Sequence, residues 1–380
     1  MTRVAGAAAA ALVTVCYLAA PATAAAPGPA AAPTVDARAY LVVDARTGDV
    51  LASSNAHERL PIASITKLMT VLVALQHHKL SDVVTVDPRA AAVGESRIPL
   101  SGGDRLTVRD LIEAALIQSA NDAADALALS VAPDYPSFAR LMNDEAKKLG
   151  LRQTHFVRPD GLDAPGEYSS AADVTTLARD LMRIRFVRET VRMETETIAG
   201  GRVLHTWDDL LGVLPGVLGV KTGHTSAAGW CQVAAVRGRG VTVYVTMLGS
   251  PSRSIRNTGL ESLLEWGLAQ FRVVSAVPSR RTYASVALPF GRRPVGLVAA
   301  RPLSVVVRVG RPLTERVSAV VSASLPVRRG AVLGRVEVWQ GRRLLGTRPL
   351  VADRDVGRPS LAGRLRFYAG RTLHHLAHIL

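Results

Sequence analysis

Apolar and polar residues alternate in two different ways along the chain, and the change divides it into two regions. In the first region, apolar runs at residues 40–43 and 50–52 flank a polar segment that contains Thr47-Gly48. This arrangement predicts a β-hairpin. Residues 62–75 then carry apolar side chains three and four positions apart, which is the period of a helix.

Two further helices are predicted in the middle of this region. Residues 107–118 begin with Thr107, a residue type that caps helix N-termini, and Asp110 stands three residues later as in a capping box. A third helix is expected over residues 121–131, where the sequence is rich in alanine.

The first region ends with two strands and a helix. Residues 229–236 and 241–248 are strand-like, and a turn of alternating Arg and Gly joins them. Residues 254–271 have the pattern of an amphipathic helix. Because strands occur at both ends of residues 37–274 and helices occur between them, the first hairpin is expected to pair with the late strands. We therefore predict an α+β domain in which helices cover an antiparallel sheet.

Residues 275–352 have a different texture, which predicts a small all-β domain. Short β-branched segments alternate with turns of Gly, Pro and Arg. The expected strands cover residues 283–288, 295–299, 303–309, 316–323, 332–339 and 343–350. No cluster of catalytic residue types lies in this region.

The last segment, residues 353–380, ends in a predicted amphipathic helix. Its apolar residues fall on one helical stripe, and Arg and His residues lie off that stripe. The stripe consists of Leu361, Leu365, Tyr368, Ala369, Leu373, Leu376 and Leu380. A basic amphipathic helix suits attachment to an anionic membrane surface through residues 360–380. Packing of this helix on the β domain is the alternative.

The first 26 residues have the organisation of a secretion signal. Arg3 precedes an apolar stretch over residues 4–20, and a small-x-small cleavage pattern follows at residues 22–24. Residues 27–36 then read as a linker. The sequence therefore predicts export, with the mature protein on the outer face of the cytoplasmic membrane or in the cell wall.

The two cysteines add one alternative and one exclusion. Lipidation of Cys16 is an alternative to cleavage, but Val-Thr-Val at residues 13–15 is a poor approach to a lipidated cysteine. Without the signal only Cys231 remains, so an internal disulfide is excluded. Cys231 is expected to be a small buried apolar residue rather than a reactive thiol.

The formal net charge of +15 favours polyanionic partners in general. Only five of the 46 basic residues are Lys, so Arg carries most of this charge. The sequence has no zinc-ligand spacing, no aromatic-studded basic sheet and no basic recognition helix, so nucleic acid is not an expected partner. A scattered basic surface is the simpler interpretation.

The clearest candidate chemistry lies at Ser64-Ile65-Thr66-Lys67, which opens the predicted helix after Pro61. Side chains three residues apart share a helix face, so the Lys67 amine can reach the Ser64 hydroxyl. A serine nucleophile needs a base, and a lysine serves when burial or a second cation lowers its pKa. The helix N-terminus adds a field that stabilises developing negative charge. A solvated surface pair is the alternative for this motif alone.

Two other short motifs accompany the first. Ser119-x-Asn121 lies at the junction of two predicted helices, where helix capping alone also explains these residue types. Lys221-Thr222-Gly223 begins a predicted strand, and Gly223 allows a substrate backbone to approach the strand edge. Because Lys is so rare in this chain, Lys-Thr-Gly is not expected by chance.

In this order, on a helix start, an inter-helix turn and a late strand, the three motifs resemble those of the penicillin-binding proteins and serine β-lactamases. From about Tyr40 to its end, the chain is similar to the low-molecular-mass penicillin-binding proteins that act as D-alanyl-D-alanine carboxypeptidases. The likeness includes residues 61–70, 119–123, 161–166, 168–171 and 219–225. The β domain and the amphipathic tail also resemble this group, and soluble β-lactamases lack both.

The resemblance implies a role for each residue of the first two motifs. Ser64 would be the acylated nucleophile and Lys67 its base. Ser119 would relay a proton to the departing D-alanine, and Asn121 would hold the substrate amide.

The resemblance also implies roles for the late strand and for one arginine. Lys221 would tune the electrostatics of the site, and Thr222 would bind the terminal carboxylate beside Gly223. The backbone N–H groups of Ser64 and His224 would form the oxyanion hole. Arg256 is similar to the arginine that this family places near the carboxylate, and a guanidinium fork suits a carboxylate.

Two segments depart from the family pattern. Arg158 stands where Asn is common, and Thr206-Trp207-Asp208 stands where an Asn-rich turn is usual. Both flank the site, so they bear on substrate preference and rate more than on the reaction class.

The implied reaction is removal of the terminal D-alanine from peptidoglycan stem pentapeptides through an acyl-enzyme, with β-lactam antibiotics as inhibitors. It needs no metal and no organic cofactor. A D,D-endopeptidase or a β-lactamase with the same nucleophile is one alternative. A catalytically silent wall-binding protein is another.

Overall fold

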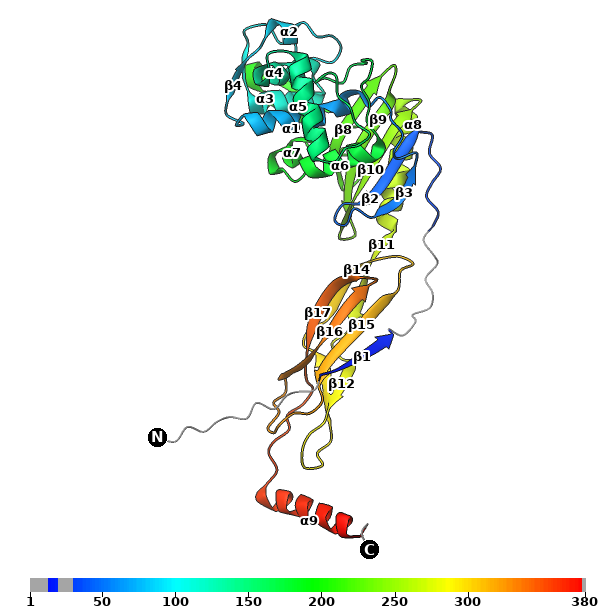
Figure 1. Ribbon diagram of the computed structural model, residues 1–380, viewed down its shortest axis with the longest axis vertical. Coiled ribbons are helices and arrows are strands. Elements are labelled where there is room, and N and C mark those ends of the chain that lie inside the picture. The colour runs from blue at the N-terminus through cyan, green and yellow to red at the C-terminus, as the bar shows by residue number, and fades with distance from the viewer. Residues whose placement is uncertain (1–12, 20–29, 378–380) are drawn as a thin grey trace, which may run out of the picture. The chain divides into compact units, whose positions relative to one another are not determined.

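The computed structural model describes residues 13–19 and 30–377 (Figure 1). They form two compact units, one over Ala30–Gln270 and one from Phe271 onward, and the second also contains strand β1 (Val13–Ala19). Of the predicted signal segment, only β1 lies within the described residues, where it pairs antiparallel with β15 (Leu313–Val320). Cleavage of the signal stays a prediction.

The first unit is built on a five-stranded antiparallel sheet with the order β3-β2-β10-β9-β8. Its strands are β2 (Ala39–Asp44), β3 (Val50–Ser54), β8 (Val217–Thr225), β9 (Gly229–Gly238) and β10 (Val241–Ser250). The N-terminal hairpin joins the late strands through β2 and β10, as the sequence predicts. This order leaves β8, which carries Lys221-Thr222-Gly223, as an edge strand.

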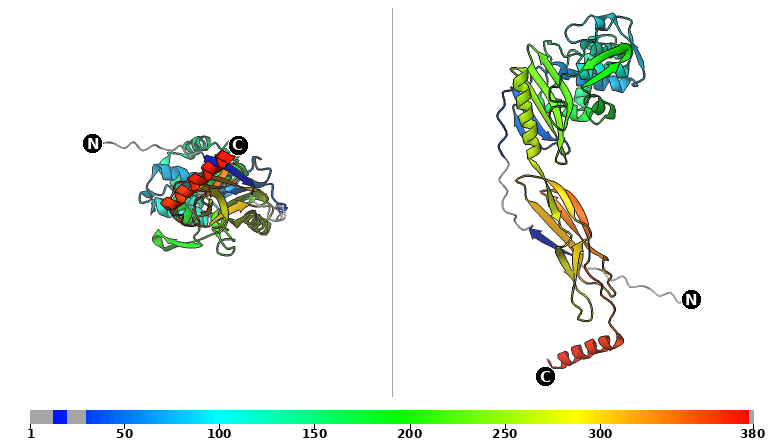
Figure 2. Two further views of the ribbon diagram at one scale, coloured as in Figure 1. Left: turned by 90° about the horizontal axis from the view of Figure 1, so that it is seen from below. Right: turned by 180° about the vertical axis from the view of Figure 1, so that it is seen from behind.

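One face of the sheet is covered by α8 (Arg253–Ala269). Gly259 and Gly267 of this helix lie directly against Met247 and Val243 of β10. The missing side chains let the helix approach the strand closely. Figure 2 shows α8 on the face of the sheet that is opposite to the other helices.

The other face carries a layer of helices and two short two-stranded sheets. Thr175 of α6 shares a hydrogen bond with Thr246 of β10, which points away from α8 because neighbouring strand residues face opposite ways. The helices are α1 (Lys67–His77), α2 (Pro88–Ala91), α3 (Val108–Glu113), α4 (Asn121–Val131), α5 (Tyr135–Lys148), α6 (Ala171–Leu181) and α7 (Arg185–Thr190). The two-stranded sheets are β4 (Val83–Thr85) with β5 (Arg105–Thr107) and β6 (Thr195–Ile198) with β7 (Arg202–His205).

Helices α1 and α4 form the centre of this layer. Every side chain from residue 67 to 74 and from 121 to 128 is buried. Four of the eight residues at 121–128 are alanines, which allow neighbouring helices to approach closely. The buried residues include Lys67, Asn121, Asp122 and Asp125, so this core contains polar groups that need internal partners.

The second unit is an all-β domain with two sheets. One has the order β1-β15-β16-β17-β13-β12, and the other is the pair β11-β14. Its remaining strands are β11 (Phe271–Val277), β12 (Thr282–Val286), β13 (Val295–Ala299), β14 (Leu303–Arg308), β16 (Val332–Gln340) and β17 (Arg343–Ala352). Alternate valines and leucines of these strands form its core.

Helix α9 (Leu361–Ala377) follows the β domain. Phe367 and Tyr368 contact Phe290 edge-to-face, whereas Leu361 and Leu365 remain 79% and 70% exposed. Within the described part of the chain, we find no helix with the length and apolarity needed to cross a bilayer.

The predicted fold class and most predicted elements are confirmed, but two helix boundaries were wrong. Residues 63–66 form a separate 3-10 turn, η1 (Ala63–Thr66), and α1 begins only at Lys67. The last predicted helix ends at Ala269, and Phe271 opens β11 instead. Phe271 fits the helical period, but pairing of its strand with β14 decides its conformation. Helices α2, α5, α6 and α7 and both short two-stranded sheets were not predicted.

Replacing Gly267 by Ala tests the close packing of α8 on the sheet. A Cβ atom at Gly267 lies 2.8 Å from Cγ1 of Val243 and 3.2 Å from Cγ1 of Val42. Valine side chains have little freedom to move aside. We expect this clash to outweigh the ~1 kcal/mol helix preference of Ala over Gly and to reduce the free energy of unfolding by about 1–2 kcal/mol. Urea unfolding measures the change.

Gly94→Ala is the matched control, because a Cβ atom there meets nothing within 4 Å. We expect its stability to change by less than about 0.5 kcal/mol. A Gly267→Ala protein that is as stable as the wild type contradicts the packing described.

Candidate active site

Ser64 lies in the η1 turn, between the sheet and the start of α1. The turn is held in place by close backbone contacts on two sides. A Cβ atom at Gly161 would lie 2.2 Å from the carbonyl oxygen of Ala63, and one at Gly223 would lie 2.9 Å from that of Ile62. Gly161 also has a φ of +77°, which glycine adopts most easily. These two glycines allow a loop and the edge strand β8 to approach the Ser64 turn.

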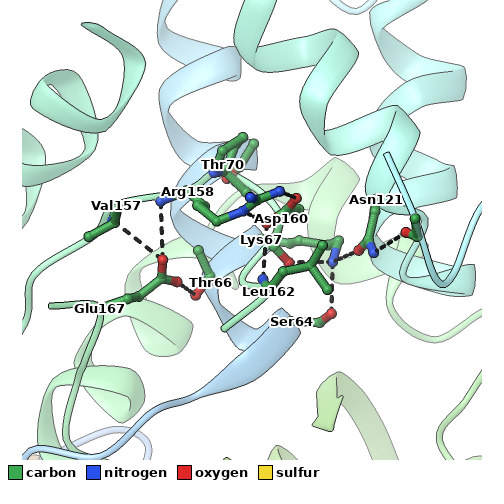
Figure 3. A network of polar contacts seen from close by, with 12 residues as sticks. Ser64, Thr66, Lys67, Thr70, Asn121, Val157, Arg158, Asp160, Leu162 and Glu167 are labelled. Atoms are coloured by element: carbon green, nitrogen blue, oxygen red, sulfur yellow. Dashed lines mark hydrogen bonds and ion pairs between the residues drawn. The ribbon is translucent and has the colours of Figure 1, made fainter. Parts of the chain in front are cut away.

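Lys67 is completely buried and donates three hydrogen bonds (Figure 3). Its Nζ lies 2.7 Å from Ser64 Oγ, 2.7 Å from Asn121 Oδ1 and 2.6 Å from the carbonyl oxygen of Asp160. Three acceptors satisfy the three protons of an ammonium group. Burial lowers the pKa of Lys67 to about 8, against the opposing effect of nearby carboxylates, of which Asp160 is the strongest. The amine is therefore poised to change charge near neutral pH.

Asn121 is fixed from both ends of its amide. Its Nδ2 donates to the Gly94 carbonyl at 2.9 Å, so its Oδ1 is directed at Lys67. Its backbone N–H donates to the Ser96 carbonyl at 2.7 Å. The position at the first residue of α4 places the side chain beside α1.

Ser119 occupies a left-handed backbone conformation, with φ 62° and ψ 30°. It ends a π-helix, η2 (Ala114–Gln118), that continues α3. A non-glycine residue in this region stores strain, which is typical of functional positions. The predicted helix over residues 107–118 thus begins with the expected Thr107 capping box but ends in a distorted turn that presents Ser119 to the site.

Lys221 of β8 is the second buried amine. Its Nζ donates to Ser119 Oγ at 2.8 Å and to the carbonyl of Thr222 at 2.9 Å. Burial lowers the pKa of Lys221 well below its ordinary value, and the charge of Lys67 lowers it further. Each of the two buried amines therefore donates a hydrogen bond to one serine hydroxyl of the site.

Three predicted residues remain: Thr222 and His224 belong to β8, and Arg256 belongs to α8. Thr222 is nearly buried, and the exposed His224 stacks on Trp230 with ring centroids 4.1 Å apart. The guanidinium carbon of Arg256 lies 5.6 Å from the centre of the Trp230 ring. Arg256 is buried, and its guanidinium donates to Asp209 and Asn257.

A cavity of about 290 Å³ opens beside the Ser64 turn. Asp163 closes one of its walls, because its carboxylate accepts hydrogen bonds from Thr225 Oγ1 at 2.6 Å and from the Ala227 N–H at 3.1 Å. The cavity is lined by Pro61, Ile62, Ala63, Gly161, Leu162, Asp163, Ala164, Pro165, Glu167 and Ala227.

A group of acidic residues behind Lys67 was not predicted. Asp125 and Asp160 are buried, and burial raises the pKa values of Asp125 and Glu167 to about 7. Arg158, which the sequence singled out only as a departure, forms a bidentate ion pair with Asp160. The likeness of residues 161–166 to the family and the departure at Arg158 were the sequence signals for this region.

The other departure lies at the rim of the site. Trp207 is 48% exposed, and its indole N–H donates to the carbonyl of Gln118 at 2.9 Å. Asp208 is buried beside it. Trp207 thus contacts the residue that precedes Ser119 without contributing a reacting atom.

Comparison with known proteins identifies the family. The sequence profile of the D-alanyl-D-alanine carboxypeptidase family matches residues 26–252, and that of the C-terminal domain of penicillin-binding protein 5 matches residues 285–358. The D-alanyl-D-alanine carboxypeptidase DacC of Escherichia coli (strain K12) is 34% identical over 369 residues, which cover 92% of this chain and 91% of that protein.

Solved structures agree with this result. Penicillin-binding protein 5 from Haemophilus influenzae is 26% identical and superimposes with a TM-score of 0.63, covering 87% of this chain and 100% of that chain. Penicillin-binding protein D2 from Listeria monocytogenes in its ampicillin-bound form is 32% identical, with a TM-score of 0.57 over 62% of this chain and 99% of that chain. The chain therefore belongs to the D-alanyl-D-alanine carboxypeptidases, a family of serine peptidases among the penicillin-binding proteins.

Proposed function

We propose that this chain removes the terminal D-alanine from peptidoglycan stem pentapeptides through an acyl-enzyme at Ser64. The observation that carries the proposal is the 2.7 Å hydrogen bond between Lys67 Nζ and Ser64 Oγ, made by a fully buried amine. An amine with a pKa of about 8 is neutral in a useful fraction of molecules near neutral pH. In that form it accepts the serine proton.

In the proposed acylation step, Ser64 Oγ is the nucleophile. Ser64 Oγ loses its proton to Lys67 and forms a bond with the carbonyl carbon of the penultimate D-alanine. The carbonyl oxygen becomes an oxyanion, for which the backbone N–H groups of Ser64 and His224 are the proposed donors. The amide C–N bond breaks, and the nitrogen of the terminal D-alanine takes the proton that Lys67 had accepted, relayed through Ser119, which Lys221 holds. Lys67 is then neutral again.

Deacylation completes the cycle. A water molecule adds to the ester carbonyl, the ester C–O bond breaks, and the tetrapeptide leaves with a new carboxyl group. Lys67 takes a proton from this water and passes it to the departing Ser64 Oγ. Apart from the water molecule, these steps use side chains and backbone N–H groups of this protein.

Substrate would align antiparallel to the edge strand β8, as an added strand. This alignment places the terminal carboxylate of the peptide near Thr222 and His224. Arg256 lies behind Trp230 and is held by Asp209, so it would contribute positive potential to that end of the site. Asn121, whose amide is already fixed, would receive the peptide backbone on the opposite side.

We further propose that the protein acts outside the cytoplasm and that α9 attaches it to an anionic membrane surface. The support is the exposed apolar surface of Leu361, Leu365 and Tyr368 on a helix that also carries arginines. The predicted secretion signal agrees with this placement.

Ser64→Ala tests the proposed nucleophile. We expect the wild type to release D-alanine from a pentapeptide ending in D-Ala-D-Ala and the variant to lose at least about 10⁴-fold in rate, because no acyl-enzyme can form. The measurement is D-alanine release, with thermal unfolding as the control for folding. Normal turnover by Ser64→Ala would contradict the proposal.

Two further substrates, cross-linked peptides and penicillin, separate the alternatives. Cleavage of cross-linked peptides in place of D-alanine release would point to an endopeptidase, and rapid release of opened penicillin would point to a β-lactamase. If the folded wild type is neither active nor labelled by penicillin, a silent binding protein remains.

Replacing both Leu361 and Leu365 by Gln tests the membrane proposal. Each leucine loses roughly 1.5–3 kcal/mol of apolar burial in a bilayer, so we expect binding to vesicles of anionic lipid to fall at least tenfold. Co-sedimentation measures binding, and D-alanine release from a soluble pentapeptide should stay unchanged. Undiminished vesicle binding by the folded variant would show that α9 is not the anchor.

A further inference from the structure

Asp160 contacts the site through two different groups (Figure 3). Its backbone carbonyl accepts the hydrogen bond from Lys67 Nζ at 2.6 Å. Its carboxylate is fully buried and accepts two hydrogen bonds from Arg158, at 3.0 Å from Nε and 2.7 Å from a terminal nitrogen. The Leu162 N–H adds a third bond to the carboxylate at 3.0 Å. One residue therefore both orients Lys67 and holds a charge close to it.

The loop that carries Asp160 is tied to the nucleophile helix at two further points. Thr70 of α1 donates its hydroxyl to the Pro159 carbonyl at 2.5 Å. Glu167 accepts a hydrogen bond from Thr66 Oγ1 at 2.8 Å and another from the Arg158 backbone N–H at 3.1 Å. Together with the two hydrogen bonds from the Arg158 side chain, these bonds fix the position of the Asp160 carbonyl relative to Lys67.

We propose that Asp160 and Arg158 form a positioning pair that directs the Lys67 amine at Ser64 and sets the pH range in which that amine is a base. Arg158 holds the Asp160 carboxylate in one orientation, and Asp160 in turn supplies a fixed backbone acceptor and a fixed negative charge. Neither residue lines the cavity beside the Ser64 turn. The inference rests on the proposed function, in which Lys67 is the base.

Asp160 has to be weighed against every other charge around Lys67. The groups that face Lys67 are Asp125 of α4, Asp160 and Arg158 of the loop after α5, Glu167 before α6, Glu95 before β5 and Lys221 of β8. Among the carboxylates, Asp160 favours the charged amine most strongly, because it raises the pKa of Lys67 more than Asp125, Glu167 or Glu95 does. Arg158 limits this effect by pairing with the same carboxylate.

These charges determine the direction in which Asp160→Asn changes the pKa of Lys67. Asp160→Asn removes the strongest opposing charge and leaves the Arg158 cation without its partner, and both changes disfavour a charged Lys67. The pKa of Lys67 then falls, and the neutral amine prevails at lower pH. Asparagine keeps the side-chain acceptor for the Leu162 N–H, so the backbone of the loop has the same partner.

The test measures the rate of Ser64 acylation by a fluorescent penicillin between pH 5.5 and 10. We expect the rate of the wild type to rise with the neutral fraction of Lys67, and the midpoint of this rise to move down by about 1 pH unit in Asp160→Asn. Asp144→Asn is the matched control, because it removes one exposed carboxylate of α5 that pairs with Lys147. Its midpoint should equal that of the wild type.

Arg158 is tested by a second pair of variants. Arg158→Gln removes both hydrogen bonds from the guanidinium to the Asp160 carboxylate. We expect the plateau rate of acylation to fall about tenfold, because the Asp160 carbonyl then loses its fixed position. Arg158→Lys keeps the positive charge and should recover most of this loss. Thermal unfolding of each variant identifies any that fail to fold.

The outcomes separate the two proposals. If the folded wild type is not labelled at Ser64, the proposed function fails. If the wild type is labelled with a rising pH profile but Asp160→Asn keeps the same midpoint, only the positioning pair is overturned. Should Asp160→Asn not fold, equal plateau rates for Arg158→Gln and the wild type overturn it, and a loss in Arg158→Gln that Arg158→Lys restores supports it.

Discussion

Two lysine side chains buried in one site are the constraint on which the rest of this structure depends. A buried ammonium group loses its hydration, so each amine needs oxygen acceptors from the protein or has to give up its proton. Lys67 obtains its acceptors from the Ser64 turn, from α4 and from the loop after α5. Lys221 obtains its acceptors from Ser119 and from its own strand. The elements that surround the site are those that supply these oxygens.

The fold meets this demand by bringing backbones unusually close. The edge strand β8 and the loop at Gly161 both approach the Ser64 turn at distances that a Cβ atom would prevent. The distorted end of the helix before Ser119 serves the same purpose, because a regular helix would point that hydroxyl elsewhere. Close approach also shields the amines from water, which keeps their pKa values low.

The sequence predicted the parts of this arrangement that repeat or that form short motifs. The pairing of the first hairpin with β10, the capping box at Thr107 and the three motifs with Ser64, Lys67, Ser119, Asn121, Lys221 and Thr222 all followed from spacing or resemblance. The burial of Asp125 and Asp160 and the partial burial of Glu167 could not be predicted, because an acidic residue in a helix or loop normally faces solvent. Their burial results from tertiary contacts between α4, α5 and the loop after α5. The sequence marks Arg158 only as a departure from the family pattern, because it does not show that Arg158 pairs with Asp160.

The pKa of Lys67 tests the account most directly. The chain has only five lysines, of which Lys79, Lys147 and Lys148 are exposed, so ¹³C-labelled lysine gives a simple NMR spectrum with three reference signals. The Lys67 signal is assigned by its absence from Lys67→Arg. If Lys67 is the base for Ser64, we expect this signal to titrate near pH 8. Titration near the ordinary lysine value of about 10.4 would contradict it, because Lys67 would then be charged at neutral pH and would not be the base for Ser64.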